Sequence, residues 1–318
     1  MGYEAIIGHA RPKKLLNSML ENDRLPHALL FSGPPGVGKF TLAMRLAKDL
    51  FCERSSACDH CRSCQNVERR NHPDLRIIES ETSIGIEDLR NLQKEIYQAP
   101  YEQKRRIIIF DGAEKMTRDA ANALLKTLEE PPIYNLFVLV TSNEREIPLT
   151  IKSRCVRVGF GPLSRNDIRS YFLNLKHLDE KKADLTAALS YGSISVGLFW
   201  LDEAHLLIRQ KLAEAILGKT KSYVLITLLA ERIAKNGTEM LVYLHFLLSL
   251  LQDLWLLHHS SGFAAIRNTD LVDLLRGKRY DPEWIVLSMN KVQETIRAVR
   301  YNIGRWLAAE HMLISIVR

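Results

Sequence analysis

Proline is scarce in the later part of the chain. Of the 11 prolines, only Pro282 lies beyond Pro162. The region after residue 162 instead carries long apolar runs at helical spacing, with few turn signals. This scarcity of helix-breaking residues predicts that the region is almost entirely helical.

Targeting and membrane signals are also missing. Residues Met1 to Ala5 do not begin a basic segment followed by an apolar one, which predicts no signal peptide. The richest apolar stretch, around Leu241 to Leu257, is interrupted by four polar residues: His245, Ser249, Gln252 and Asp253. We expect a buried helix there rather than a membrane span, and a cytoplasmic protein without membrane contact.

No segment carries a strong excess of one charge. The chain has 318 residues, enough for two or three domains, and its formal net charge is +7. A modest positive excess is compatible with contact to a nucleic-acid backbone. It is equally typical of an ordinary solvated surface, so charge alone assigns no partner.

Short apolar runs without polar alternation mark the first part of the chain. They lie at 28–31, 107–110 and 136–140 and suit strands buried on both faces of a parallel sheet. Thr117 is placed to cap an intervening helix whose apolar face comprises Ala121, Leu124, Leu125 and Leu128. Alternating strands and helices predict a doubly wound α/β domain over residues 1–162, with a further strand at 154–160. Helical parts at 163–205 and 206–318 should follow.

A glycine-rich loop follows the first expected strand and opens a helix. It reads Gly33-Pro34-Pro35-Gly36-Val37-Gly38-Lys39-Phe40-Thr41. In such a P-loop the glycines free backbone amides to surround phosphate groups, and the lysine reaches the β- and γ-phosphates. The motif predicts a P-loop domain whose candidate site for ATP or ADP comprises Gly33, Gly36, Gly38, Lys39, Thr41 and Asp111.

Several residues that ATP hydrolysis requires are absent. The residue after the lysine normally supplies a hydroxyl to Mg²⁺, but Phe40 has no oxygen, and Thr41 lies about 100° further around the helix. Asp111 ends an expected strand, as a magnesium-organising acid does, yet Gly112 follows it where a water-orienting glutamate is usual. Glu114 comes two residues later. We expect no magnesium-dependent hydrolysis, and the loop either binds nucleotide without turnover or stays empty.

Four of the five cysteines crowd into 13 residues. Cys52, Cys58, Cys61 and Cys64 have the spacing C-x5-C-x2-C-x2-C, which predicts a closed structural zinc site with all four as ligands. Two alternatives remain: His60 replacing one thiolate, or a ferredoxin-like cluster. The latter needs a distant cysteine followed by proline, and Cys155 is followed by valine. Cys155 itself is expected to be a small buried hydrophobic residue.

Three segments resemble the clamp-loader subunits of bacterial DNA polymerase III and their replication-factor-C relatives. They are Asp111–Thr117 with Asn122–Pro132, the Thr141–Asn143 segment similar to the family's sensor 1, and Ser153-Arg154-Cys155, similar to its SRC motif. The resemblance is dense over residues 1–200. It implies an AAA+ fold with a zinc module at about 52–72, a helical lid at 163–205 and an all-helical collar at 206–318 that holds a hetero-oligomer together.

The departures from the family pattern resemble the delta-prime type of subunit. Phe40, Gly112 and Ser195 stand where the gamma and tau motors keep a hydroxyl, an acid and a sensor-2 arginine, whereas Arg154 is retained. The resemblance implies a stator that does not hydrolyse ATP but supplies Arg154 as an arginine finger to a neighbouring motor. The ordinary alternative is that Arg154 caps a strand or pairs with a local acid.

The implied function is loading of the sliding clamp onto primed DNA, with gamma/tau-type and delta-type subunits as partners within the DNA polymerase holoenzyme. One alternative is an active gamma/tau-like motor that recruits Thr41 and Glu114 to the missing roles. Another is a stand-alone zinc-containing nucleic-acid-binding protein. The four tryptophans, Trp200, Trp255, Trp284 and Trp306, fall in the helical part and are expected to be core residues.

Overall fold

The structure is a computed structural model, and it describes residues 6–54, 56–218, 222–259, 266–276, 280–300 and 304–317. The N-terminal residues Met1 to Ala5, for which no signal peptide was expected, lie outside the described residues. The chain divides into two compact units. Unit 1 comprises Met1–Ile168 with Gly192–Ser195, and unit 2 comprises Arg169–Tyr191 with Val196–Arg318. The finer division at residues 162 and 205 remains a prediction.

Unit 1 is built on a five-stranded parallel sheet in the order β2-β3-β4-β1-β5. Its elements are α1 (Ala10–Glu21), β1 (Ala28–Ser32), α2 (Lys39–Phe51), α3 (Arg62–Glu68), β2 (Leu75–Glu79), α4 (Ile86–Ile96), β3 (Arg106–Asp111), η2 (Ala113–Lys115), α5 (Arg118–Glu129), β4 (Asn135–Thr141), η3 (Glu144–Glu146), α6 (Leu149–Lys152) and β5 (Val156–Gly159). The three apolar runs are strands β1, β4 and β3, and the strand expected at 154–160 is β5 in shorter form. The edge strand β2 was not predicted.

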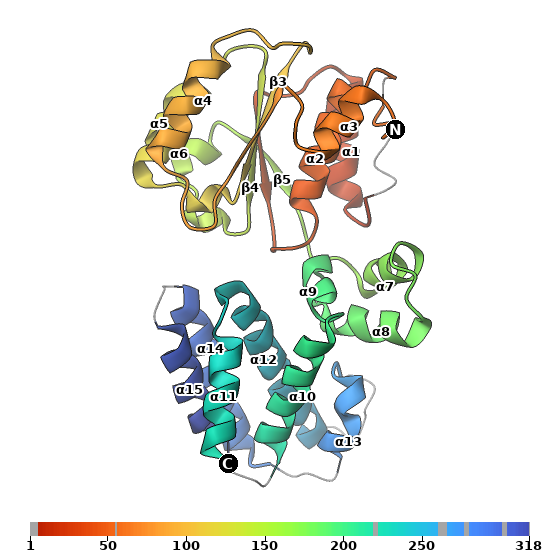
Figure 1. Ribbon diagram of the computed structural model, residues 1–318, viewed down its shortest axis with the longest axis vertical. Coiled ribbons are helices and arrows are strands. Elements are labelled where there is room, and N and C mark those ends of the chain that lie inside the picture. The colour runs from red at the N-terminus through yellow and green to blue at the C-terminus, as the bar shows by residue number, and fades with distance from the viewer. Residues whose placement is uncertain are drawn as a thin grey trace. The chain divides into compact units, whose positions relative to one another are not determined.

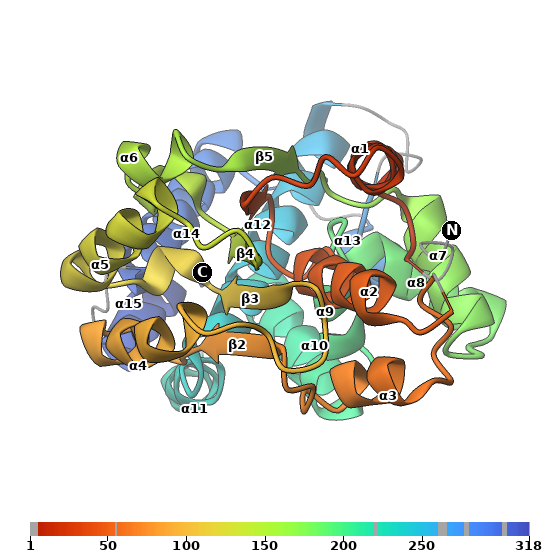
Figure 2. The same cartoon turned by 90° about the horizontal axis from the view of Figure 1, so that it is seen from above.

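Helices cover both faces of this sheet. Alternate residues of each central strand enter two separate cores: Leu29 and Phe31 pack with α1 and α2, whereas Ala28 and Leu30 pack with α4 and α5. Figures 1 and 2 show α1, α2 and α3 on one side of the sheet and α4, α5 and α6 on the other. Burial on both faces explains why the strands read as uninterrupted apolar runs, and the doubly wound α/β class is confirmed.

Helix α5 begins and buries its apolar face as expected. The Thr117 hydroxyl accepts a hydrogen bond from the Ala120 amide at 3.2 Å, which satisfies one of the free donors of the first helical turn. Ala121, Leu124 and Leu128 are buried against the sheet, whereas Leu125, the fourth residue of the predicted face, is only partly buried there. The helix places Glu129 at its last position, close to the residues discussed below.

The described part of the chain beyond β5 contains helices and no strand. These are α7 (Arg165–Asn174), α8 (Glu180–Leu189), α9 (Ile194–Phe199), α10 (Glu203–Leu217), α11 (Tyr223–Ile233), α12 (Gly237–His259), η5 (Thr269–Leu271), α13 (Val272–Leu275), α14 (Pro282–Arg300) and α15 (Arg305–Ile316). Helix α12 is long and apolar enough to cross a membrane, but most of its apolar residues lie in the unit 2 core. It is the buried helix expected around residues 241–257.

The tryptophans only partly match the expectation of core positions. Trp200 and Trp284 are buried, and Trp255 packs against the core while partly exposed. Trp306 is 48% exposed, so its assignment to the core was wrong. It occupies the second position of α15, where the buried residues of the helix begin only at Ala309.

Candidate nucleotide site, cysteine cluster and Arg154

The P-loop joins β1 to α2 with a backbone that only glycine adopts without strain. Gly36 has φ +70° and Gly38 has φ +102°, both in the range that L side chains rarely adopt. Lys39 begins α2, and only 6% of its surface is exposed. Its ammonium donates hydrogen bonds to the carbonyls of Gly33 at 2.8 Å and Pro34 at 2.6 Å. The lysine therefore stabilises the conformation of the P-loop through hydrogen bonds to the loop's own backbone.

The Lys39 ammonium lies in an unfavourable environment for its charge. Burial lowers the pKa of Lys39 to about 8, and the negative charges of Glu114 and Asp111 only partly oppose that shift. A nucleotide phosphate would stabilise this ammonium, but the lysine would have to leave the Gly33 and Pro34 carbonyls to reach it.

Two other segments of unit 1 lie directly on the P-loop. The Ser195 amide donates to the Gly36 carbonyl at 3.3 Å, and a Cβ added at Gly36 would lie 2.3 Å from the Ser193 hydroxyl. On another part of the loop, His9 Nε2 donates to the Val37 carbonyl at 2.7 Å. The sequence placed Ser195 at the sensor-2 position, and the structure brings it to the P-loop. Its short neutral side chain offers no charge for a phosphate.

Phe40 is used for packing instead of metal binding. Its ring packs against the unit 1 core, and the Arg70 guanidinium lies over it, 4.9 Å from the ring centroid. Arg70 also pairs with Glu79 at 2.9 Å. Thr41 is exposed on a different face of α2. The structure therefore brings no hydroxyl from Thr41 to the place that Phe40 occupies.

The acids after β3 do not form a catalytic pair. Asp111 ends the strand, and burial together with Glu79 and Glu114 raises its pKa. Gly112 has φ +78°, so a glutamate there would be strained. Glu114 instead accepts hydrogen bonds from both the amide and the hydroxyl of Ser142, the first at 3.0 Å. These bonds tie Glu114, the acid two residues after Gly112, to the Thr141–Asn143 segment.

The four clustered cysteines converge as the spacing predicted. Cys52 follows α2, Cys61 and Cys64 lie at the start of α3, and all four Sγ atoms lie within 4.8 Å of one another. Four thiolates bound to one Zn²⁺ at about 2.3 Å would have their sulfurs about 3.8 Å apart. The arrangement therefore fits a metal ion of this kind. Cys155 is not a member of the group, and burial raises the pKa of its thiol to about 12.

Backbone amides point at the sulfurs of the cluster. The Cys61 amide donates to Cys58 Sγ at 3.3 Å, and the Cys64 amide donates to Cys61 Sγ at 3.4 Å. Hydrogen bonds from the backbone of His60 and Cys61 lower the pKa of Cys58 to about 6, whereas burial raises the pKa of Cys64 to about 12. The backbone hydrogen bonds thus favour the thiolate form of Cys58, whereas burial disfavours the thiolate form of Cys64.

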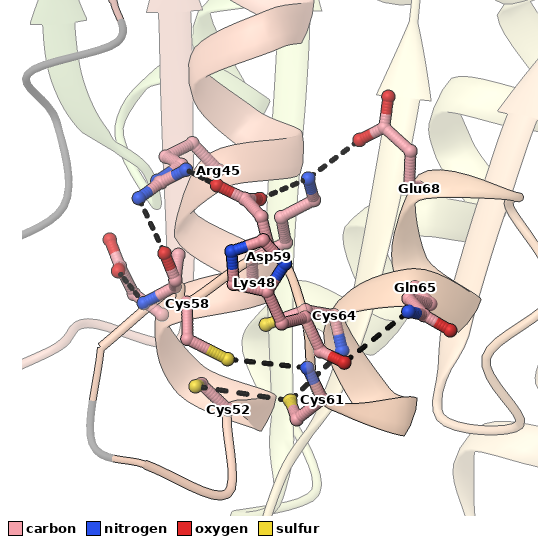
Figure 3. Close-up of polar contacts among 12 residues, drawn as sticks. Arg45, Lys48, Cys52, Cys58, Asp59, Cys61, Cys64, Gln65 and Glu68 are labelled. Atoms are coloured by element: carbon pink, nitrogen blue, oxygen red, sulfur yellow. Dashed lines mark hydrogen bonds and ion pairs between the residues drawn. The ribbon is translucent and has the colours of Figure 1, made fainter.

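An ion-pair network joins the cysteine loop to the P-loop helix (Figure 3). Asp59 lies between Arg45 at 2.8 Å and Lys48 at 2.6 Å, and Lys48 also pairs with Glu68 on α3 at 2.6 Å. Arg45 further donates to the Ala57 carbonyl. Apart from the arginine-rich composition of the loop, no sequence pattern pointed to this network. It ties the cysteine cluster to the middle of α2.

Arg154 follows α6 and contacts its own chain. Nη1 donates to the Thr150 carbonyl at 3.0 Å and to the Ser153 hydroxyl at 3.3 Å, and Nη2 donates to Glu129 Oε1 at 2.8 Å. The arginine side chain remains 34% exposed. Pairing with a local acid, the alternative left open by the sequence, is thus present in this structure. Because the pair is exposed, it is weak enough to be exchanged for another anion.

Comparison with known proteins identifies relatives of the first unit. Residues 8–164 match the family described as "DNA polymerase III, delta subunit". The chain is 41% identical over 156 residues to DNA polymerase III subunit delta' of Bacillus subtilis (strain 168), covering 48% of this chain and 47% of that one. It is 33% identical over 213 residues to subunit gamma of Buchnera aphidicola subsp. Schizaphis graminum (strain Sg), covering 64% and 58%.

Among solved structures, a gamma subunit-related protein from Thermotoga maritima matches 95% of this chain and 98% of its own, at 22% identity and a TM-score of 0.45. The alignments to the two curated relatives span about half of those proteins' length. Both delta-prime and gamma relatives are matched. The resemblance inferred from the motifs is confirmed at the level of the family.

Proposed function

We propose that this chain is the non-hydrolysing, delta-prime-type subunit of a DNA polymerase III clamp loader, because residues 8–164 match the delta-subunit family of that polymerase and the chain is similar to a subunit delta'. It supplies Arg154 to the nucleotide site of a neighbouring motor subunit of gamma/tau type. A delta-type subunit, the sliding clamp and primed DNA complete the assembly. The site of action is the cytoplasm.

The proposal rests on a contrast between the residues of the chain's own nucleotide site and Arg154. The groups that hydrolysis needs inside the chain are engaged elsewhere: Lys39 with the P-loop carbonyls, and Glu114 with Ser142. Phe40 offers no ligand for Mg²⁺. Arg154, which acts only in another subunit's site, keeps a partly exposed guanidinium. The chain has therefore lost the residues that serve its own site and retained the one that serves a neighbour.

The chemistry asked of Arg154 is electrostatic. During phosphoryl transfer, negative charge develops on the transferred group, and a guanidinium placed against it stabilises the transition state. An arginine finger supplied in trans accelerates hydrolysis by about 10³- to 10⁵-fold in well-studied systems. Arg154 needs no nucleotide in its own P-loop to do this.

The cysteine cluster has a structural role in this proposal. Cys52, Cys58, Cys61 and Cys64 would hold one Zn²⁺, and four thiolates leave no open coordination position for a substrate. The ion would fix the loop that carries Asp59, and through Arg45 and Lys48 that loop braces α2. Metal binding thus supports the shape of the P-loop domain.

The deciding experiment uses the reconstituted clamp loader with motor subunits whose own SRC-motif arginines are replaced by alanine. Arg154 is then the only finger. Arg154→Ala should lower ATP turnover by about 10³-fold, whereas Arg157→Ala, three residues further along and paired with Glu144, should not. Equal turnover with wild type and Arg154→Ala would refute the proposal.

An active motor is the second candidate, because the gamma relative matches a larger share of the chain than the delta-prime relative does. It predicts that the purified chain turns over ATP in a magnesium-dependent manner at about 1 s⁻¹ or faster. If the chain is instead the non-hydrolysing subunit, the purified chain alone should show no ATP turnover.

A further inference from the structure

The Arg154 guanidinium is held on its own chain by three acceptors from two segments. Thr150 and Ser153 belong to the α6 segment, whereas Glu129 ends α5, 25 residues earlier. These contacts occupy three of the five N–H donors of the guanidinium. Among the acceptors, only Glu129 carries a charge, so it alone neutralises the arginine.

We propose that Glu129 is a positioning residue: it holds Arg154 on its own subunit and releases it when the terminal phosphate of a neighbour's ATP competes for the guanidinium. This inference rests on the proposed function, because it takes Arg154 as the finger. It adds a resting state, in which Arg154 is paired with Glu129. Arg154 must leave this pair before it can stabilise the transition state at the neighbour's phosphate.

Charge explains why the two states exclude each other. A terminal phosphate carries more negative charge than a carboxylate and accepts paired hydrogen bonds from a guanidinium. A carboxylate kept at the guanidinium would cancel part of its charge and repel the phosphate at the same time. Arg154 therefore transfers from Glu129 to the phosphate. ADP lacks the terminal phosphate and leaves Arg154 on Glu129.

The surroundings of the pair indicate a surface that a partner covers. The two most exposed large apolar side chains among the described residues lie on the segments that carry it. Ile133, four residues after Glu129, is 93% exposed, and Leu149, which begins α6, is 79% exposed. Large apolar side chains exposed to this extent next to a functional residue are typical of a surface that a partner protein covers. The Glu129–Arg154 pair thus lies where a neighbouring subunit would be docked.

Glu130 provides a matched control. It is the next residue, it is exposed, and its side chain forms no ion pair or hydrogen bond within the described residues. Glu129→Gln and Glu130→Gln remove the same charge one position apart. Only the first removes the partner of Arg154.

The test measures kcat/KM for ATP in the reconstituted complex in which Arg154 is the only finger. Glu129→Gln should raise kcat/KM about two- to fivefold, the range expected from releasing one exposed ion pair. Glu129→Ala should act in the same direction, and Glu130→Gln should leave the value unchanged. The affinity of the complex for ADP should be the same in all of them.

A double substitution separates this role from a structural one. In an Arg154→Ala background, Glu129→Gln should have no effect on kcat/KM, because there is no guanidinium left to release. An unchanged or lower kcat/KM in Glu129→Gln would overturn the inference, as would an equal rise in the Arg154→Ala background. If Arg154→Ala alone leaves turnover unchanged, the proposed function fails instead.

Discussion

The backbone amide of Ser195 donates a hydrogen bond to the carbonyl of Gly36 across 3.3 Å, joining the start of α9 to the middle of the P-loop. The contact is close enough that Gly36 has no room for a side chain, since an added Cβ would lie 2.7 Å from Ser195 Cβ. The P-loop is thus covered by the segment that carries Ser193 and Ser195. Here it presents a short neutral side chain.

Gly36→Ala should destabilise unit 1 more than Gly38→Ala does. Both glycines have positive φ, so both substitutions carry a backbone cost of about 1–2 kcal/mol. Only at Gly36 does the new Cβ meet Ser193 and Ser195, whereas nothing lies within 4 Å of a Cβ at Gly38. Overpacking should add about 1–3 kcal/mol. Denaturant unfolding of the two variants checks this, and equal losses would mean that the Ser193–Ser195 segment moves away freely.

Lys39 should make stability depend on pH above neutrality. Its folded-state pKa of about 8 lies below the usual 10.5, so between these values the unfolded chain binds more protons than the folded one. Stability contributed by this group therefore rises with pH from about 8 to 10.5. Wild type should gain thermal stability relative to Lys39→Met over that interval. A constant difference between the two proteins would show that the Lys39 pKa is not lowered.

Sequence patterns identified the elements whose environment is uniform. Strands β1, β3 and β4 are buried on both faces and therefore read as pure apolar runs. The edge strand β2 has one buried position followed by partly exposed ones, so its pattern was too weak to detect. The P-loop and the cysteine cluster were predictable because metal and phosphate chemistry fixes both residue type and spacing.

Contacts between distant segments could not be predicted in this way. The pairing of Arg154 with Glu129 and the bridging of Arg45 and Lys48 by Asp59 depend on how the elements pack. No local spacing rule relates such residues. Gly112 illustrates a third case: the sequence suggested a lost glutamate, and the backbone shows in addition a positive φ that favours glycine.

Replacing one clustered cysteine should release the metal. Cys64→Ser leaves three thiolates around a site that needs four ligands, so the zinc content should fall from about one ion per chain to well below half. The midpoint of thermal unfolding should fall by several degrees as the loop around Asp59 loosens. Cys155→Ser is the matched control, because Cys155 lies outside the cluster. Elemental analysis measures both proteins, and full zinc retention in Cys64→Ser would contradict the four-cysteine assignment.

A buried arginine should prove essential to the stability of unit 2. Arg209 on α10 is 1% exposed, donates to Asp270 at 2.9 Å and to Asn268 at 2.8 Å, and lies 4.7 Å from the centroid of the Phe246 ring. Removing one partner of a buried ion pair leaves the other charge without compensation, which typically costs about 3–5 kcal/mol. Arg209→Ala should approach that loss.

The exposed Arg297 on α14 provides the comparison, since substitutions at such surface positions change stability by only about 0.5 kcal/mol. Urea unfolding of Arg209→Ala and Arg297→Ala measures the difference. The Asp270 carboxylate is 31% exposed and can recover some hydration, which places the expected loss for Arg209→Ala at the lower end of the range. A loss below about 1 kcal/mol would show that water replaces the arginine, and that apolar packing alone holds α10 against the segment carrying Asn268.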